Sequence, residues 1–113
     1  MDGLLIQSVG AYTVVEFHTP SLMDAVQLQT LADQLYKLVG IEDRRWIVLD
    51  FEKVEYVSSQ FIGILMVLNK RLAELPKSKL ILCGIGPKLQ ELLHITRLDR
   101  ILDIRPTQEE AVV

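Results

Sequence analysis

Two short apolar runs, each followed by a helical pattern, constrain the fold of this chain more than any other feature. Residues 46–49 and 80–83 contain no charged side chain, which is typical of central strands covered on both faces. Residues 61–75 follow the first run and predict a helix, and Pro87 opens another helix after the second run. Strands that alternate with helices call for parallel pairing through right-handed crossovers. The sequence therefore predicts an α/β fold.

The first forty residues add an antiparallel pair and one more helix. Residues 4–9 and 12–17 are β-prone runs separated by Gly10-Ala11, and we expect them to form a hairpin. The helix that follows begins with Thr19 or Ser21 as its N-cap and stops at Gly40. Apolar residues at helical spacing predict its buried face: Leu28, Leu31, Ala32, Leu35, Leu38 and Val39.

The end of the chain completes the predicted fold. Residues 101–104 predict a last strand, and residues 109–113 begin a final helix. Together, these elements predict a mixed central sheet of about four to five strands, opened by the antiparallel hairpin and packed with about four helices. We find no repeat or linker that would divide residues 1–113, so the expectation is a single domain.

Charge and hydropathy exclude several classes of protein. The net charge is −3 and the basic residues are scattered, which argues against binding of nucleic acid. The longest apolar stretch, residues 64–68, is much shorter than the ~20 residues that a membrane span requires. The N-terminus has no signal-peptide pattern. We therefore expect a cytoplasmic protein without membrane insertion.

Residues with catalytic or metal-binding potential are few. His18 and His94 stand in no metal-ligand spacing with Cys83, whose apolar surroundings predict a buried structural thiol. The segment Gly84-Ile85-Gly86 precedes a helix, but Leu89 stands where a dinucleotide turn has its third glycine. The sequence therefore predicts no enzyme activity, no cofactor and no metal site.

The serine pair Ser58-Ser59 is the strongest functional candidate. It stands where a loop enters a helix, and a hydroxyl there can accept a hydrogen bond from the unpaired backbone N–H groups, so capping is its minimum role. Asp50 and Glu52 follow the end of the preceding strand, where open α/β sheets tend to place their sites. The alternative for Asp50 is a turn aspartate that accepts hydrogen bonds from local backbone donors.

These segments together resemble the STAS family (sulfate transporter and anti-sigma factor antagonist). A strand that ends in Asp50 leads to Tyr56-Val57, then to Ser58-Ser59 and a helix. Residues 80–85 are similar to the next strand and turn of the family, and residues 92–102 are similar to its helix-loop-strand ending. The resemblance covers almost the whole chain and is closest to the stand-alone anti-sigma factor antagonists.

The resemblance implies a non-enzymatic, protein-binding regulator that is switched by phosphorylation. Ser59 takes the position of the phosphorylated serine, with Ser58 as the second choice. The implied partners are an anti-sigma serine kinase, which the unphosphorylated form would capture and so free a sigma factor, and a cognate serine phosphatase; a homodimer is also compatible. The predicted partner-binding residues are Asp50, Glu52, Ser58, Ser59, Gln60, Phe61 and Ile62.

Two positions depart from the family pattern, and one segment needs an explanation. Phe61 stands where the family usually has glycine, and its ring either fills the core or presents an apolar anchor to a partner. Arg97 replaces a frequent glycine and would cost about 1 kcal/mol in a left-handed conformation. Residues 61–68 are more apolar than one buried face requires. Either part of this surface meets another protein, or Gly63 lets the helix approach a neighbouring element closely.

The sequence is also compatible with two functions other than a phosphorylation-switched regulator. STAS-like domains also serve as structural subunits of signalling scaffolds, transporters and lipid-transport complexes, where no phosphorylation is needed. A nucleotide or small anion bound in a groove near Asp50 and Ser59 is the third hypothesis.

Overall fold

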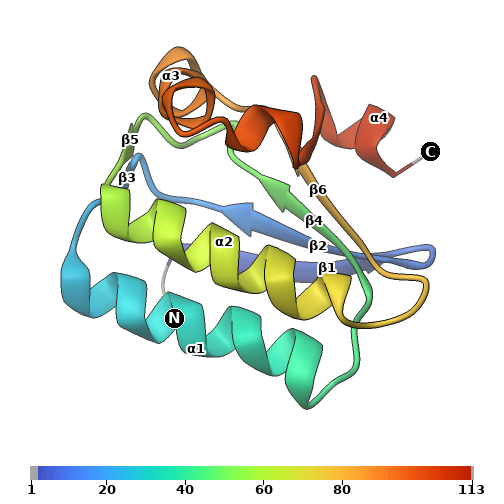
Figure 1. Cartoon of the computed structure of the whole chain (residues 1–113). Coiled ribbons are helices and arrows are strands. Elements are labelled where there is room, and N and C mark those ends of the chain that lie inside the picture. Colours follow the sequence, from blue (N-terminus) through green and yellow to red (C-terminus); the bar gives the residue numbers. More distant parts are fainter. Residues whose placement is uncertain (1–2, 113) are drawn as a thin grey trace.

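The computed structural model describes residues 3–112, in which a five-stranded sheet forms the centre of the fold (Figure 1). The strands lie in the order β1-β2-β4-β6-β7, with β1 and β2 antiparallel and every other neighbouring pair parallel. The predicted mixed sheet with its opening hairpin is therefore confirmed. The strands of this sheet are β1 (Leu4–Val9), β2 (Tyr12–Phe17), β4 (Trp46–Asp50), β6 (Lys79–Cys83) and β7 (Asp103–Arg105).

Helices cover the two faces of the sheet unequally. In Figure 1, α1 and α2 lie side by side on one face, and the larger apolar core fills the space between them and the sheet. The other face is covered by the short α4, under which Tyr12, Val14, Val48, Ile81 and Cys83 cluster with Ala111. No helix within residues 3–112 combines the length and apolar character needed to cross a membrane. The helices are α1 (Ala25–Gly40), α2 (Ser59–Ala73), α3 (Pro87–Ile95) and α4 (Gln108–Ala111).

The start of α1 differs from the prediction. Asp24 is the N-cap, and its Oδ1 accepts a hydrogen bond from the backbone N–H of Gln27 at 2.9 Å. The predicted caps, Thr19 and Ser21, are wrong because residues 21 and 22 form a strand instead. The predicted buried face of α1, in contrast, is confirmed at all six positions.

The strand that displaces the helix start belongs to a second, very small sheet. In it, β3 (Ser21–Leu22) pairs in parallel with β5 (Tyr56–Val57). The backbone N–H groups of Glu55 and Tyr56 both donate to Pro20 O, at 2.8 and 2.9 Å, and Ser58 N donates to Leu22 O at 3.1 Å. The loops that precede α1 and α2 are thus joined to each other.

The last elements also shift from their predicted bounds. Strand β7 begins at Asp103, because a 3₁₀ helix over Leu98–Arg100 places Ile101 in an exposed turn. Arg97, which precedes this helix, has φ of 61°, so the left-handed conformation anticipated at this position is present. The predicted final helix is α4, and Val113 lies outside the described residues.

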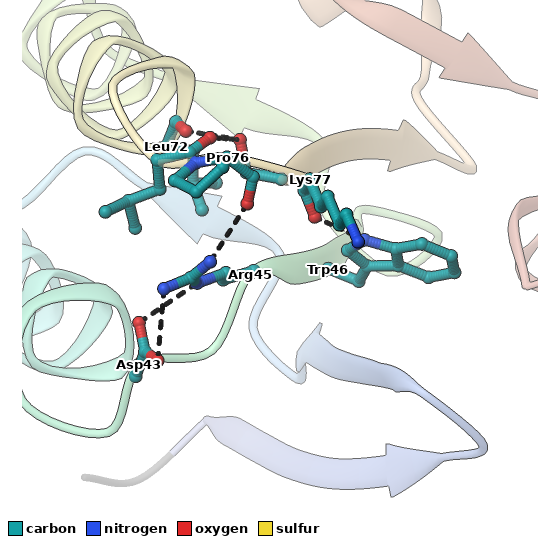
Figure 2. Close-up of polar contacts among 8 residues, drawn as sticks. Asp43, Arg45, Trp46, Leu72, Pro76 and Lys77 are labelled. Atoms are coloured by element: carbon teal, nitrogen blue, oxygen red, sulfur yellow. Dashed lines mark hydrogen bonds and ion pairs between the residues drawn. The ribbon is translucent and has the colours of Figure 1, made fainter.

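Polar contacts join the loops that precede β4 and β6 (Figure 2). The Arg45 guanidinium donates to the Asp43 carboxylate and to Pro76 O, each at 3.1 Å. The Trp46 indole N–H donates to Lys77 O at 2.7 Å. Asp43 and Lys77 have φ of 54° and 55°, a conformation that these contacts compensate. The network fixes the amino ends of two adjacent parallel strands, whereas α2 begins beyond their carboxyl ends.

Candidate functional site

The two serines occupy different positions at the start of α2. Ser58 is the N-cap, with extended backbone angles, and its Oγ accepts a hydrogen bond from Phe61 N at 3.4 Å. Ser59 is the first helical residue and is exposed. Among residues 3–112, the Ser58 hydroxyl makes the capping bond at this helix start, and the Ser59 hydroxyl makes no hydrogen bond. The predicted capping role is therefore confirmed for Ser58 and wrong for Ser59, which lies inside the helix and is exposed.

The amino end of α2 favours an anion. The first turn contains no acidic residue, whereas the last turn contains Lys70 and Arg71. The unpaired N–H groups of the first turn and the positive end of the helix dipole stabilise a negative charge by roughly 0.3–1 kcal/mol. A phosphate on Ser59 would therefore meet a favourable field, with no carboxylate in the same helical turn to oppose it.

Phe61 and Ile62 belong to the core. The Phe61 side chain is 0% exposed, and its ring lies edge-on to those of Phe17 and Phe51, with centroids 5.9 and 5.7 Å apart. Ile62 is 6% exposed. The core-packing alternative for Phe61 is confirmed, and the alternative of an apolar anchor for a partner is wrong because the ring has no surface.

The remaining members of the predicted partner-binding set differ in accessibility. Glu52, Ser59 and Gln60 are exposed and Ser58 is half-buried, whereas Asp50 is 7% exposed. A partner can therefore contact the side chains of three of these residues freely.

Asp50 closes a turn at the carboxyl end of β4. Its Oδ1 accepts a hydrogen bond from Glu52 N at 3.0 Å, which confirms the turn-capping alternative. Its Oδ2 accepts from the Gln108 side-chain amide at 2.9 Å. A Cβ at Gly84 would lie 3.0 Å from Oδ1, so this position requires glycine. The sequence analysis missed Gln108, because nothing in the local pattern indicates a contact across 58 positions.

Glu16 shares the Gln108 amide with Asp50. The same amide nitrogen donates to Glu16 Oε2 at 2.7 Å, and His18 Nε2 lies 2.8 Å from Glu16 Oε1. The hydrogen bond from Gln108 and then that from His18 lower the pKa of Glu16 below its ordinary value. Gln108 thereby holds α4 against two strands of the sheet through two carboxylates.

An open cavity of about 500 Å³ lies beside these groups. Four of the residues that line it are acidic, whereas Lys53 and His18 are the lining residues that can carry a positive charge. Ser59 does not line this cavity. Ser59 therefore does not share this cavity with Asp50, and the acidic lining does not favour an anion there. The acidic lining residues are Glu16, Asp50, Glu52 and Glu109.

Cys83 is buried where β6 faces α4. It is 0% exposed, as the sequence predicted, and burial raises the pKa of its thiol to about 12. A thiol in this state is unreactive, because the thiolate is the nucleophilic form.

The exposed side of α2 continues from Ser59 as a partly apolar surface. Met66 and Val67 are 53% and 40% exposed, and a Cβ at Gly63 would meet nothing within 4 Å. The close-approach explanation of Gly63 is therefore wrong. We call Ser59, Gln60, Gly63, Met66 and Val67 the α2 surface; their spacing places them along adjacent rows of the helix.

A groove of about 330 Å³ lies next to β5, directly before the serine pair. Met23, Tyr56 and Ile95 contribute exposed apolar area to it, and the Lys88 ammonium lies 3.9 Å from the centroid of the Tyr56 ring. Met23 and Ile95 are far apart in the sequence, which explains why the sequence analysis did not find this groove.

Comparison with known proteins identifies related chains. A family model described as STAS domain matches residues 6–111. A Bordetella bronchiseptica protein named as a candidate anti-sigma factor antagonist, BtrV, is 23% identical over 111 residues, which cover 98% of this chain and 85% of that protein. The solved structure of an anti-sigma-factor antagonist (STAS) domain protein from Planctomyces limnophilus has a TM-score of 0.85 and 25% identity, covering 98% of this chain and 95% of that one. Phosphorylated SpoIIAA from Bacillus shares the fold, with a TM-score of 0.76, 16% identity and 96% coverage of each chain.

Proposed function

The chain belongs to the STAS domain family, and from this premise we propose that it is a protein-binding regulator of the anti-sigma factor antagonist type, switched by phosphorylation of Ser59. The arrangement of the two serines is the observation that carries this proposal. Ser58 caps α2, whereas Ser59 presents an exposed hydroxyl at the same helix start. Modification of Ser59 therefore leaves the cap intact.

The phosphate would act by changing a surface and not by unfolding the domain. It adds roughly −1.5 to −2 charges at a helix end where negative charge is favourable. The same charge lies at one end of the α2 surface, whose Met66 and Val67 are apolar. A partner that buries this surface would have to desolvate the phosphate, so binding is lost while the fold persists.

The partner in this proposal is an anti-sigma serine kinase, and a cognate serine phosphatase restores the binding form. The names of the relatives support an antagonist role. The α2 surface and the groove beside β5 offer apolar area that a protein partner could bury. The domain itself carries out no reaction. Its place is the cytoplasm, and its effect on transcription is indirect, through release of a sigma factor.

Phosphorylation is tested with the full chain, ATP and the cognate anti-sigma kinase. We expect one added phosphate by intact mass, mapped to Ser59 by peptide sequencing. Ser58→Ala should still accept phosphate, although loss of the cap lowers its stability by about 1 kcal/mol. Ser59→Ala should accept none. An unmodified chain after incubation with a kinase of proven activity, or a phosphate on Ser58, would contradict the proposal.

Binding is tested with the same kinase by calorimetry. Ser59→Asp should weaken binding by tenfold or more, on the order of the cost of an unpaired charge at an interface, and Ser59→Ala should leave it unchanged. Thr30→Asp, which adds the same charge to an exposed position on α1, is the matched control and should bind normally. If the chain captures no kinase but assembles into large particles or with transporter subunits, the structural-subunit hypothesis is favoured instead.

A further inference from the structure

The two edges of the sheet differ in how they are protected. The β7 edge has three residues, of which Asp103 and Arg105 are charged and paired at 2.7 Å, and Pro106 follows directly. The β1 edge has six residues, and Leu4–Val9 contains neither a charged residue nor a proline. Within residues 3–112, no strand pairs with the outer side of β1. Proteins usually shorten, charge or cover such an edge, because its unpaired backbone groups accept another strand.

The register of the hairpin identifies the backbone groups that point outward. Val9 pairs with Tyr12 across a two-residue turn, and this closing pair of a tight hairpin is hydrogen-bonded. Hydrogen-bonded pairs recur at every second residue along the hairpin. The bond from His18 N to Gly3 O, at 2.6 Å, fits this alternation when it is counted back from Val9. The intervening residues therefore direct their N–H and C=O groups away from β2. These residues are Leu4, Ile6 and Ser8.

We propose that β1 pairs with β1 of a second copy of this chain, antiparallel, about a two-fold axis at Ile6. This alignment places Ile6 opposite Ile6 and Leu4 opposite Ser8, so every outward backbone group of both strands is paired. An alignment centred on Leu5 or Gln7 pairs fewer outward residues. A shift by one residue would place side chains of opposite faces beside each other.

The side chains of β1 favour a second copy as the occupant. Because the strand carries no charge, it meets no like-charge repulsion from an identical strand. Leu5 and Ile6 are each 41% exposed on opposite faces of the sheet, and each would be covered by the partner strand. An interface of this kind is smaller than the standard ~1,600 Å², so the dimer should dissociate on dilution.

This dimer uses a surface built from other elements than α2, and it goes beyond the proposed function. Its test is the mass of the full chain in solution, measured by sedimentation equilibrium from low micromolar to millimolar concentration. We expect the average mass to rise from monomer to dimer. Ile6→Lys should weaken association by on the order of tenfold or more, because two like charges would then lie opposite each other across the interface.

A second variant and a matched control separate association from folding. Ser8→Pro removes an outward N–H and leaves the hydrogen bonds between β1 and β2 in place, so it should also abolish the dimer. Ile101→Lys, at a position 67% exposed on another surface, should dimerise like the unaltered chain. A chain that remains a monomer at every concentration, or a dimer that persists in folded Ile6→Lys and Ser8→Pro, would overturn the proposal.

Cross-linking tests the register. Ile6→Cys should form covalent dimers with a short thiol-specific reagent, and a mixture of Leu4→Cys and Ser8→Cys should do so more than either variant alone. The unaltered chain is the control, since buried Cys83 does not react. Equal cross-linking of all single variants would contradict the alignment on Ile6.

Discussion

Replacing Phe61 by alanine tests the packing of the core beneath the start of α2. The ring is fully buried and contacts two other aromatic rings edge-on. A phenylalanine buries about 200 Å² of apolar surface, which at about 25 cal/mol per Å² corresponds to roughly 5 kcal/mol as an upper value. Phe→Ala substitutions in cores cost about 3–5 kcal/mol. Domains are stable by only about 5–15 kcal/mol, so the variant should lose a large part of its stability.

Urea unfolding followed by Trp46 fluorescence and circular dichroism measures this loss. Phe61→Leu is the matched control: it keeps most of the apolar volume and loses the ring contacts, so it should cost about 1–1.5 kcal/mol. A double-mutant cycle with Phe51→Leu isolates the contact at 5.7 Å. We expect a coupling energy of about 0.5–1.5 kcal/mol.

A loss below about 1.5 kcal/mol for Phe61→Ala, or an absent coupling with Phe51, would refute the packing argument. Kinase binding gives an independent check, because Phe61→Leu should bind like the unaltered chain. Weakened binding at unchanged stability would mean that a partner contacts the ring.

Two further predictions concern backbone strain and pH. Arg97→Gly should raise the free energy of unfolding by about 0.5–1 kcal/mol, because the φ angle of Arg97 is 61° and glycine adopts this conformation without strain. Arg100→Gly, in the 3₁₀ helix, is the control and should lower the free energy of unfolding. A lower free energy of unfolding for Arg97→Gly in urea would contradict the strain argument. The lowered pKa of Glu16 means that its carboxylate adds stability above its ordinary pKa of 4.5 and that this stability disappears as pH falls through the folded value. Gln108→Leu removes the main cause, so its unfolding midpoint should fall less steeply on acidification, and two parallel pH profiles would argue against this role.

The larger elements were predictable because each has its own local signal. The strands β4 and β6 follow from short, continuous apolar runs, and the buried face of α1 follows from helical periodicity. The small β3–β5 sheet was not predictable, because two residues are too few for a periodic pattern and their pairing joins distant segments. That pairing also explains why Ser21 is extended and why Asp24, not an earlier residue, caps α1.

The helix start that carries the candidate site was predictable in position and less so in detail. The change from a loop pattern to a helical pattern predicted a helix start at Ser58 and Ser59, but only the structure assigns the cap to Ser58. The burial of Phe61 depends on two rings from β2 and the segment after β4, and the Gln108 contact depends on how α4 returns to the sheet. Local sequence patterns give no signal for such long-range contacts.

The β3–β5 pairing has a consequence for the entropy of association. Hydrogen bonds from Ser58 N to Leu22 O and from Tyr56 N to Pro20 O restrain the segment before α2 in the unbound domain. Flexible loops lose conformational freedom when a partner orders them, and this loss weakens binding. Here hydrogen bonds order the backbone in advance, so a partner that contacts this segment would lose less conformational entropy on binding. A change of charge at Ser59 would then appear in the affinity directly, without being absorbed by rearrangement of the loop.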